Sequence, residues 1–265
     1  MSQHSAIGWI EATWNPVTGC SHVSPGCEHC YAETLSLRMG WSKLPWTNQN
    51  AAANVLLHEK RLAEPLRWKT PRRVFVNSMS DIFHERVPPE FVARMFRIMA
   101  EAERHIFQIL TKRPERMLAW FTEWLPEASS GEMPARLWPL SNVWLGVSVE
   151  DQRRANERLP LLLETPAAVR FVSFEPLLGR VEFAEFARTG QLHWAITGGE
   201  SGRDYRESEV EWTANIVATC DQYGIAPFVK QDSGPRPGKQ GRLSDALWAR
   251  KEYPIGAALS PDPRP

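Results

Sequence analysis

Short apolar runs alternate with longer amphipathic stretches along most of the chain. Many of the runs are rich in valine, isoleucine and phenylalanine, which favours buried strands. The clearest amphipathic stretch, at 89–103, places Phe91, Val92, Met95, Phe96 and Met99 on one face of a helix. The apolar runs predict strands at 7–14, 73–78, 106–110, 143–147, 169–174, 192–196 and 226–229.

Helices are expected between these strands. They are predicted at 31–39, 51–66, 114–125, 151–164 with an interruption at Pro160, and 207–223 with an end at Gly224. Strands that alternate with helices form parallel βαβ units. The predicted fold class is therefore α/β: a single (β/α) barrel, partial or complete, with about six or seven parallel strands over residues 1–231. A doubly wound open sheet is the alternative.

The last part of the chain has a different composition. Residues 232–265 are rich in glycine, proline and arginine, and they predict an irregular tail packed on or near the barrel. The formal net charge of zero argues against nucleic-acid binding driven by overall charge. No apolar run has the length of a membrane span, and the first residues lack a signal-peptide pattern. We therefore expect a cytoplasmic protein with no membrane association.

Three of the four cysteines lie within one loop, at 14–33. Cys20, Cys27 and Cys30 are spaced C-x6-C-x2-C, and proline and glycine residues punctuate the loop. Thiolate sulfur selects iron–sulfur clusters, zinc or cuprous copper over hard cations. A [4Fe–4S] cluster usually takes four cysteines, so three would leave one iron open to a cofactor or substrate.

Other interpretations of these cysteines remain open at this point. A structural zinc site could be completed by His22 or His29, because C-x2-C suits zinc. Four cysteines are few for a disulfide framework in a chain of 265 residues. The fourth, Cys220, lies among apolar residues of the helix predicted at 207–223 and is expected to be structural.

The residues around the three cysteines resemble a known protein group. Asn15-Pro16, Gly19-Cys20 and the stretch 27–33 are similar to the cluster loop of radical-SAM proteins of the spore-photoproduct-lyase-like group. That group has three residues between its first two cysteines, where this chain has six. The stretches 13–20 and 24–27 resemble more closely the phage-associated three-Cys-motif family. The resemblance extends to Ser80-Asp81, Thr111-Lys112, Gly199-Glu200 and Lys230-Gln231.

The resemblance implies an enzyme with two cofactors. Cys20, Cys27 and Cys30 would hold a [4Fe–4S] cluster, whose open iron binds S-adenosylmethionine (SAM). An electron from an external donor would cleave SAM to a radical that attacks an unidentified substrate. Kinship with photoproduct-lyase-like proteins hints at a nucleic acid or nucleotide as that substrate. The alternative is a barrel stabilised by zinc or a cluster that serves as a nucleic-acid or protein binding module.

Polar residues follow each predicted strand, and parallel barrels place their active sites at these carboxyl ends. The resemblance implies SAM amino-group contacts after the second strand and ribose contacts after the fourth. Taken singly, each residue could equally be the first of a loop or a helix cap. The predicted cofactor-binding residues are Asn77, Ser78, Ser80, Asp81, Ser148, Glu150, Gly198, Gly199 and Glu200, and the predicted catalytic residues are Lys112, Glu175, Lys230 and Gln231.

Overall fold

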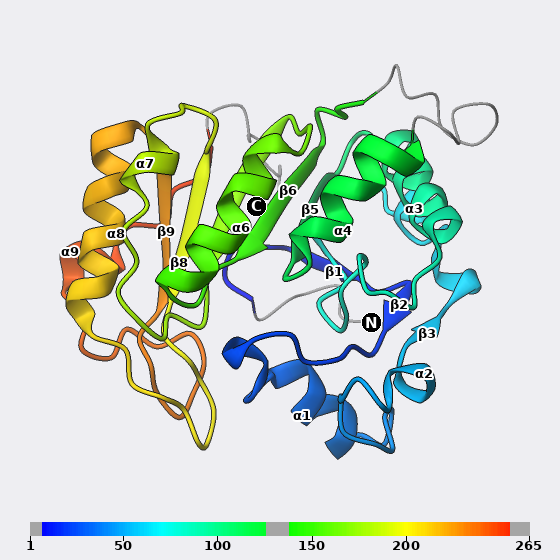
Figure 1. Ribbon diagram of the computed structural model, residues 1–265, viewed down its shortest axis with the longest axis horizontal. Coiled ribbons are helices and arrows are strands. Elements are labelled where there is room, and N and C mark those ends of the chain that lie inside the picture. Colours follow the sequence, from blue (N-terminus) through cyan, green and yellow to red (C-terminus); the bar gives the residue numbers. More distant parts are fainter. Residues whose placement is uncertain (1–6, 126–137, 255–265) are drawn as a thin grey trace.

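A computed structural model describes residues 7–125 and 138–254. Its centre is one sheet of seven parallel strands, curled into a half-barrel with helices on its outer face (Figure 1). This confirms the predicted fold class, in its partial form. Each strand pairs with the next one along the chain, in the order β1 (Ala12–Trp14), β4 (Arg73–Val76), β5 (Ile106–Thr111), β6 (Val143–Ser148), β7 (Val169–Phe174), β8 (Trp194–Gly198) and β9 (Ala226–Gln231).

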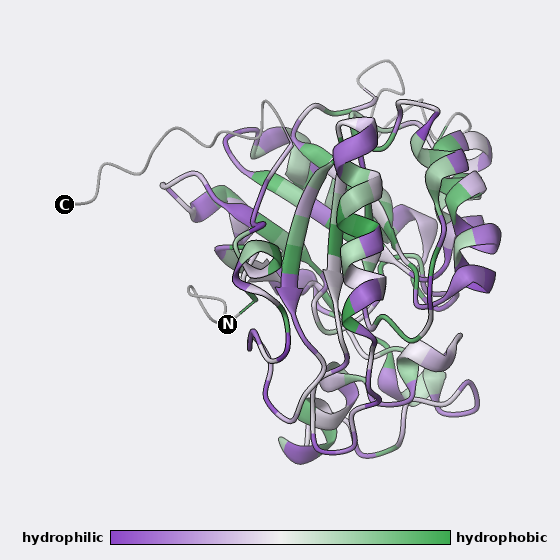
Figure 2. Ribbon diagram, turned by 90° about the vertical axis from the view of Figure 1, so that its left-hand side faces the viewer, coloured by the Kyte–Doolittle hydropathy of each residue, from purple (hydrophilic) through white to green (hydrophobic). Residues whose placement is uncertain are grey.

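Helices return the chain from one strand to the next and cover the outside of the sheet. Figure 2 shows the apolar residues gathered on the strands and on the inner faces of these helices, with hydrophilic residues outside. The first helical turn of α4 begins with Pro114, a residue preorganised for this position. The main helices are α3 (Pro89–Glu101), α4 (Pro114–Ala119), a π-helical segment (Trp120–Trp124), α6 (Gln152–Glu164), α7 (Ala184–Ala187) and α8 (Val210–Tyr223).

Side chains of the strands alternate between two buried cores. On β6, Val143, Leu145 and Val147 pack against the outer helices, while Trp144 lies in a second core on the inner face. Strands covered on both faces read as continuous apolar runs, and for this reason the sequence predicts them well. Aromatic rings dominate the inner core, which consists of Trp9, Ile10, Phe75, Trp144, Phe171, Trp194, Ile196 and Phe228.

Two predicted helices differ from the structure. The stretch 51–66 contains only the short α2 (Ala51–Asn54), then β3 (Leu56–Leu57) and two 3₁₀ turns (Glu59–Arg61 and Pro65–Arg67). The helical prediction fails here because β3 pairs with β2 (Val17–Thr18). Helix α6 runs through Pro160 without interruption, although proline removes one backbone donor.

The C-terminal stretch packs against the last strand. Arg250 O accepts from Val229 N, and Glu252 N donates to Pro227 O, so this stretch covers the open edge of β9. It is irregular except for α9 (Asp245–Trp248). Residues 255–265 of the predicted tail lie outside the described residues, as do 1–6 and 126–137 of the predicted barrel region. Within the described ranges, no helix is long and apolar enough to cross a membrane.

Candidate functional site at the carboxyl ends of the strands

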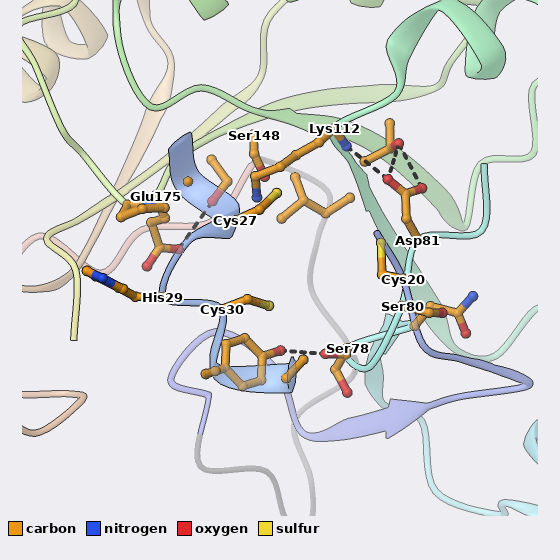
Figure 3. Close-up of a pocket in the computed structure, with 18 of the residues that line it drawn as sticks. Cys20, Cys27, His29, Cys30, Ser78, Ser80, Asp81, Lys112, Ser148 and Glu175 are labelled. Carbon is orange, nitrogen blue, oxygen red and sulfur yellow. Dashed lines mark hydrogen bonds between the residues drawn. The ribbon is translucent and has the colours of Figure 1, made fainter. Parts of the chain in front are cut away.

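A cavity of about 280 Å³ opens where the cysteine loop lies over the carboxyl ends of the strands (Figure 3). Part of its wall is apolar and is formed by Ile7, Trp9, Trp46, Phe75 and Leu110. Most of the site residues predicted from the sequence line the rest of it, from seven separate segments of the chain. They are Cys20, Cys27, Cys30, Asn77, Ser78, Ser80, Asp81, Lys112, Ser148, Glu175, Gly199, Glu200, Lys230 and Gln231.

The cysteine loop is fixed at its beginning by the pairing of β2 with β3. Gly19 follows with φ of 82°, and a side chain there would collide with the carbonyl of Asn54, so only glycine fits. The loop then forms a 3₁₀ turn (Pro25–Cys27) and leads into α1 (Tyr31–Arg38), which begins directly after Cys30. The turn and the helix therefore set the positions of the second and third thiols.

All three thiols are free, half-buried and face the cavity (Figure 3). Burial raises the pKa of the Cys20 thiol to about 12, although the Arg113 guanidinium lowers it in part. Burial also raises the pKa of the Cys30 thiol. Because thiolates are the ligands of soft metals, metal binding must displace these protons. Cys220 is free and buried in α8 and does not line the cavity.

Asn77 has the most unusual geometry among the predicted cofactor-binding residues. Its φ of 61° lies in the left-handed region, which non-glycine residues rarely adopt. Its side chain is buried, and Oδ1 accepts weakly from Val17 N at 3.4 Å. The Nδ2 donor has no hydrogen-bond partner among the described residues. A strained residue that lines a cavity with an unpaired donor is the arrangement expected of a ligand contact.

The predicted site residues next to Asn77 form hydrogen bonds within the protein. Ser80 donates its hydroxyl to Val17 O at 3.0 Å, and Ser78 O accepts from the Tyr31 hydroxyl at 2.7 Å. The Asp81 carboxylate accepts from Thr111 Oγ1 at 2.8 Å and from the backbone N–H of Lys112 at 3.1 Å. Asp81 therefore ties the end of β4 to the end of β5.

The charged residues of the cavity differ in how far they are paired. Lys230 forms an ion pair with Glu175 at 2.7 Å. The Lys112 ammonium has no hydrogen bond or ion pair with any described residue, and its side chain extends toward Cys27 (Figure 3). Burial lowers the pKa of Lys112, but the Glu150 carboxylate and the nearby cysteine thiolates raise it above its ordinary value. Lys112 therefore supplies an available positive charge.

The other wall of the cavity joins the cysteine loop to the loop after β8. His29 Nδ1 donates to Glu200 Oε2 at 2.9 Å, and Arg206 Nε donates to the same oxygen at 2.9 Å. Arg206 also reaches back to Glu28 and to Pro25 O. Burial raises the pKa of Glu200, but the hydrogen bonds from Arg206 and His29 outweigh it and lower the pKa below its ordinary value. The charged Glu200 carboxylate thus links His29 of the cysteine loop to Arg206.

Two predicted cofactor-binding residues, Glu150 and Gly198, do not line the cavity. Glu150 is fully buried, where it accepts from Ser24 Oγ at 2.6 Å and from Arg158 Nη1 at 3.0 Å. Through Ser24, Glu150 therefore holds the cysteine loop against the end of β6. At Gly198, a Cβ would stand 2.8 Å from Glu175 Oε1, so glycine leaves room for that carboxylate.

Sequence reasoning missed the arginines that hold the loop in place. Arg158, Arg206 and Arg113 all contact the loop or its supports. Although a charged residue in a loop usually faces solvent, Arg113 is only 4% exposed. In the sequence, only its position shortly after a predicted strand, beside Lys112, indicates a role.

His84, in the loop after β4, predicts a pH-dependent stability. Its Nδ1 accepts from Arg86 N at 3.0 Å, so the ring is neutral and Nε2 donates to Ser21 Oγ at 3.0 Å. Burial and the Arg113 guanidinium lower the pKa of His84 from 6.5 to about 4, against the opposing effect of Glu85 and Asp81. The unfolded chain therefore binds a proton at pH values where the folded chain does not.

We expect the free energy of unfolding to fall as the pH is lowered from about 6.5 to about 4, by on the order of 3 kcal/mol from this group. His84→Gln should flatten that part of the profile. Urea denaturation of both proteins at several pH values in this range would measure the difference. Parallel profiles for the two proteins would contradict the assignment to His84.

Comparison with protein families gives one match. Residues 4–250 match a family model described as a protein of unknown function (DUF5131). No curated protein and no solved structure gave a match. Because the match spans nearly all of the half-barrel and its cysteine loop, the chain belongs to the DUF5131 family.

Proposed function

We propose that this protein is a radical-SAM-like enzyme. It would bind a [4Fe–4S] cluster through Cys20, Cys27 and Cys30 and cleave SAM to start radical chemistry on a substrate in the half-barrel. The observation that carries the proposal is that three free thiols from one loop share a cavity with the polar carboxyl ends of parallel strands. Such an edge is where barrel enzymes hold their active sites.

We favour a cluster over a single zinc ion for this loop. Tetrahedral zinc with Zn–S bonds of about 2.3 Å would bring its thiolates within about 4 Å of one another. Among the described residues, no three histidine, cysteine or acidic side chains lie close enough to hold one metal ion. The thiols instead surround an open space (Figure 3), and a four-iron cube keeps its thiolates further apart than one ion does.

The polar groups of the cavity suit a zwitterionic cofactor. Asn77 Nδ2 and the Lys112 ammonium are unpaired donors among the described residues, and both match the carboxylate of an amino acid. Ser78 and Ser80 retain oxygen lone pairs that can accept from an amino group. Ser148, at the end of β6, is small enough to leave room for a ribose, and its hydroxyl can bond to one.

When bound, the cluster would supply one electron that cleaves SAM to methionine and a 5′-deoxyadenosyl radical, and an external donor would restore that electron to the cluster. The chain would position the reactants and exclude water. Trp9, Phe75 and Leu110 provide apolar surface for an adenine or a substrate. Glu175, paired with Lys230 and supported by Ser173 Oγ, would hold or move a proton on the substrate, with Gln231 beside it.

Anaerobic reconstitution with iron and sulfide tests the proposal. We expect a brown protein with about four irons and four sulfides per chain. After reduction, addition of SAM should change its electron paramagnetic resonance spectrum and release 5′-deoxyadenosine. A protein that binds the cluster but releases no 5′-deoxyadenosine would instead indicate a redox function without radical chemistry. A colourless protein that retains one zinc ion would contradict the proposal.

A second candidate, a metal-stabilised binding module, is favoured by one observation. The large hydrophobic side chains that are exposed among the described residues all lie between 23 and 57, within the cysteine loop or in the segment after it. Trp41, at 59% exposure, is the most exposed of them. Arg38 and Lys43 are exposed nearby in the chain, as in surfaces that stack nucleic-acid bases on aromatic rings. A zinc-loaded protein that binds single-stranded nucleic acid, with binding lost in Trp41→Ala, would support this candidate.

A further inference from the structure

A buried arginine stands beside the first thiol of the cysteine loop. Arg113 lies two residues after the end of β5, and its guanidinium Nη1 lies 3.5 Å from Cys20 Sγ. Its Nη2 donates to both Ser21 O and Ser21 Oγ at 3.1 Å. One side chain thus contacts the sulfur of Cys20 and the backbone of the next residue.

The guanidinium is held in this orientation from its other side. Arg113 Nε donates to Glu85 at 3.0 Å, and Nη1 also lies 3.4 Å from Asp81 Oδ2. Asp81 is itself fixed by Thr111 Oγ1, and that hydroxyl oxygen accepts from Arg113 N at 2.9 Å. A planar group held by carboxylates on one side can aim its remaining N–H at one atom. The position of Nη1 against Cys20 is therefore set by the fold.

The three thiols are not equivalent in this respect. The polar contact of Cys27 is with Ser24 Oγ, at 4.0 Å, and no arginine contacts Cys27 or Cys30 among the described residues. Any cluster held by the loop would therefore accept an N–H···S hydrogen bond from a buried guanidinium at the Cys20 corner, whereas the Lys112 ammonium lies on the side of Cys27 and Cys30. Hydrogen bonds to the sulfurs and the local charge are two of the factors that set the reduction potential of iron–sulfur clusters.

We propose that Arg113 is a positioning residue that donates an N–H···S hydrogen bond to Cys20 and raises the reduction potential of the cluster. This inference rests on the proposed function. The reduced cluster carries one more negative charge than the oxidised one, so a fixed guanidinium stabilises the reduced state more. The pairing with Asp81 and Glu85 moderates this effect and keeps the cation buried.

Redox titration of reconstituted protein, followed by visible absorption and electron paramagnetic resonance, tests the inference. The variants are Arg113→Lys, Arg113→Gln and, as a control, Arg153→Gln, which removes an exposed arginine on α6 paired with Glu157. We expect potentials in the order wild type, then Arg113→Lys, then Arg113→Gln as the lowest. Lysine keeps the charge, but it cannot contact Ser21 and Cys20 with the same planar geometry. Arg153→Gln should match the wild type.

The outcomes separate this inference from the function on which it rests. A wild-type protein that takes up no cluster overturns both. Clusters of equal potential in the wild type and Arg113→Gln overturn the role of Arg113 and leave the proposed function intact, as does an equal shift in Arg153→Gln. If Arg113→Gln fails to fold, Arg113→Lys decides the question: a potential equal to the wild type contradicts the inference, and a lower one supports it.

Discussion

Replacing Cys20, Cys27 or Cys30 with alanine, one at a time, is expected to abolish [4Fe–4S] binding. Each thiol faces the same cavity and comes from a differently fixed part of the loop, so no other cysteine can take its place. A cube held by two thiolates would leave two irons without protein ligands, where the proposed site leaves one. Iron and sulfide content after anaerobic reconstitution, together with the visible absorption of the cluster, measures the loss.

Cys220→Ala is the matched control. This thiol is buried in α8 against the outer core and does not line the cavity, so its removal should lower stability modestly and leave the iron content unchanged. Circular dichroism would establish that each of the four variants folds. The ligand assignment fails if Cys220→Ala loses as much iron as the loop variants, or if any one of the three loop variants retains a full cluster.

Glu150→Ala is expected to be the most destabilising substitution at the site. Glu150 and Arg158 form a fully buried ion pair at 3.0 Å, beneath the cysteine loop. Removing the carboxylate leaves a buried, uncompensated guanidinium, which costs about 3–5 kcal/mol. The loop would also lose the hydrogen bond from Ser24 Oγ. Urea denaturation of the metal-free protein measures the free energy of unfolding.

Two further variants separate the causes of this effect. Glu157→Ala removes the exposed partner of Arg153 on the same helix, and stability should be nearly unchanged because solvent screens that pair. The double variant Glu150→Leu with Arg158→Met removes both charges at once and should recover much of the lost stability. If Glu150→Ala is no less stable than Glu157→Ala, Glu150 is not the support described above.

The alternation of strands and helices could be predicted from the sequence because the sheet is buried on both faces. Strands such as β6 and β7 are continuous apolar runs, and α3 has a clear apolar face. The stretch 51–66 could not be predicted in the same way. Its local pattern is helical, but Leu56 and Leu57 pair with β2, a contact across about forty residues that no local pattern reveals.

The candidate site, too, could be predicted only in part from the sequence. The cysteine trio and most polar strand ends lie together because parallel topology brings carboxyl ends to one edge, which a linear pattern can indicate. The partners of those residues could not be predicted. Glu150 pairs with the buried Arg158, and Arg113 contacts Cys20. Neither contact could be predicted, because the partners become neighbours only in the completed fold.

The cysteine loop is made early in synthesis but acquires its supports late. Its thiols lie within the first thirty residues, whereas the side chains that hold them belong to Arg113, Glu150, Arg158 and Arg206. While the chain grows on the ribosome, the supports of the loop are completed only when the segment carrying Arg206 emerges, after those carrying Arg113, Glu150 and Arg158. Assembly of any metal centre on this loop would therefore follow the folding of the strands that carry these supports.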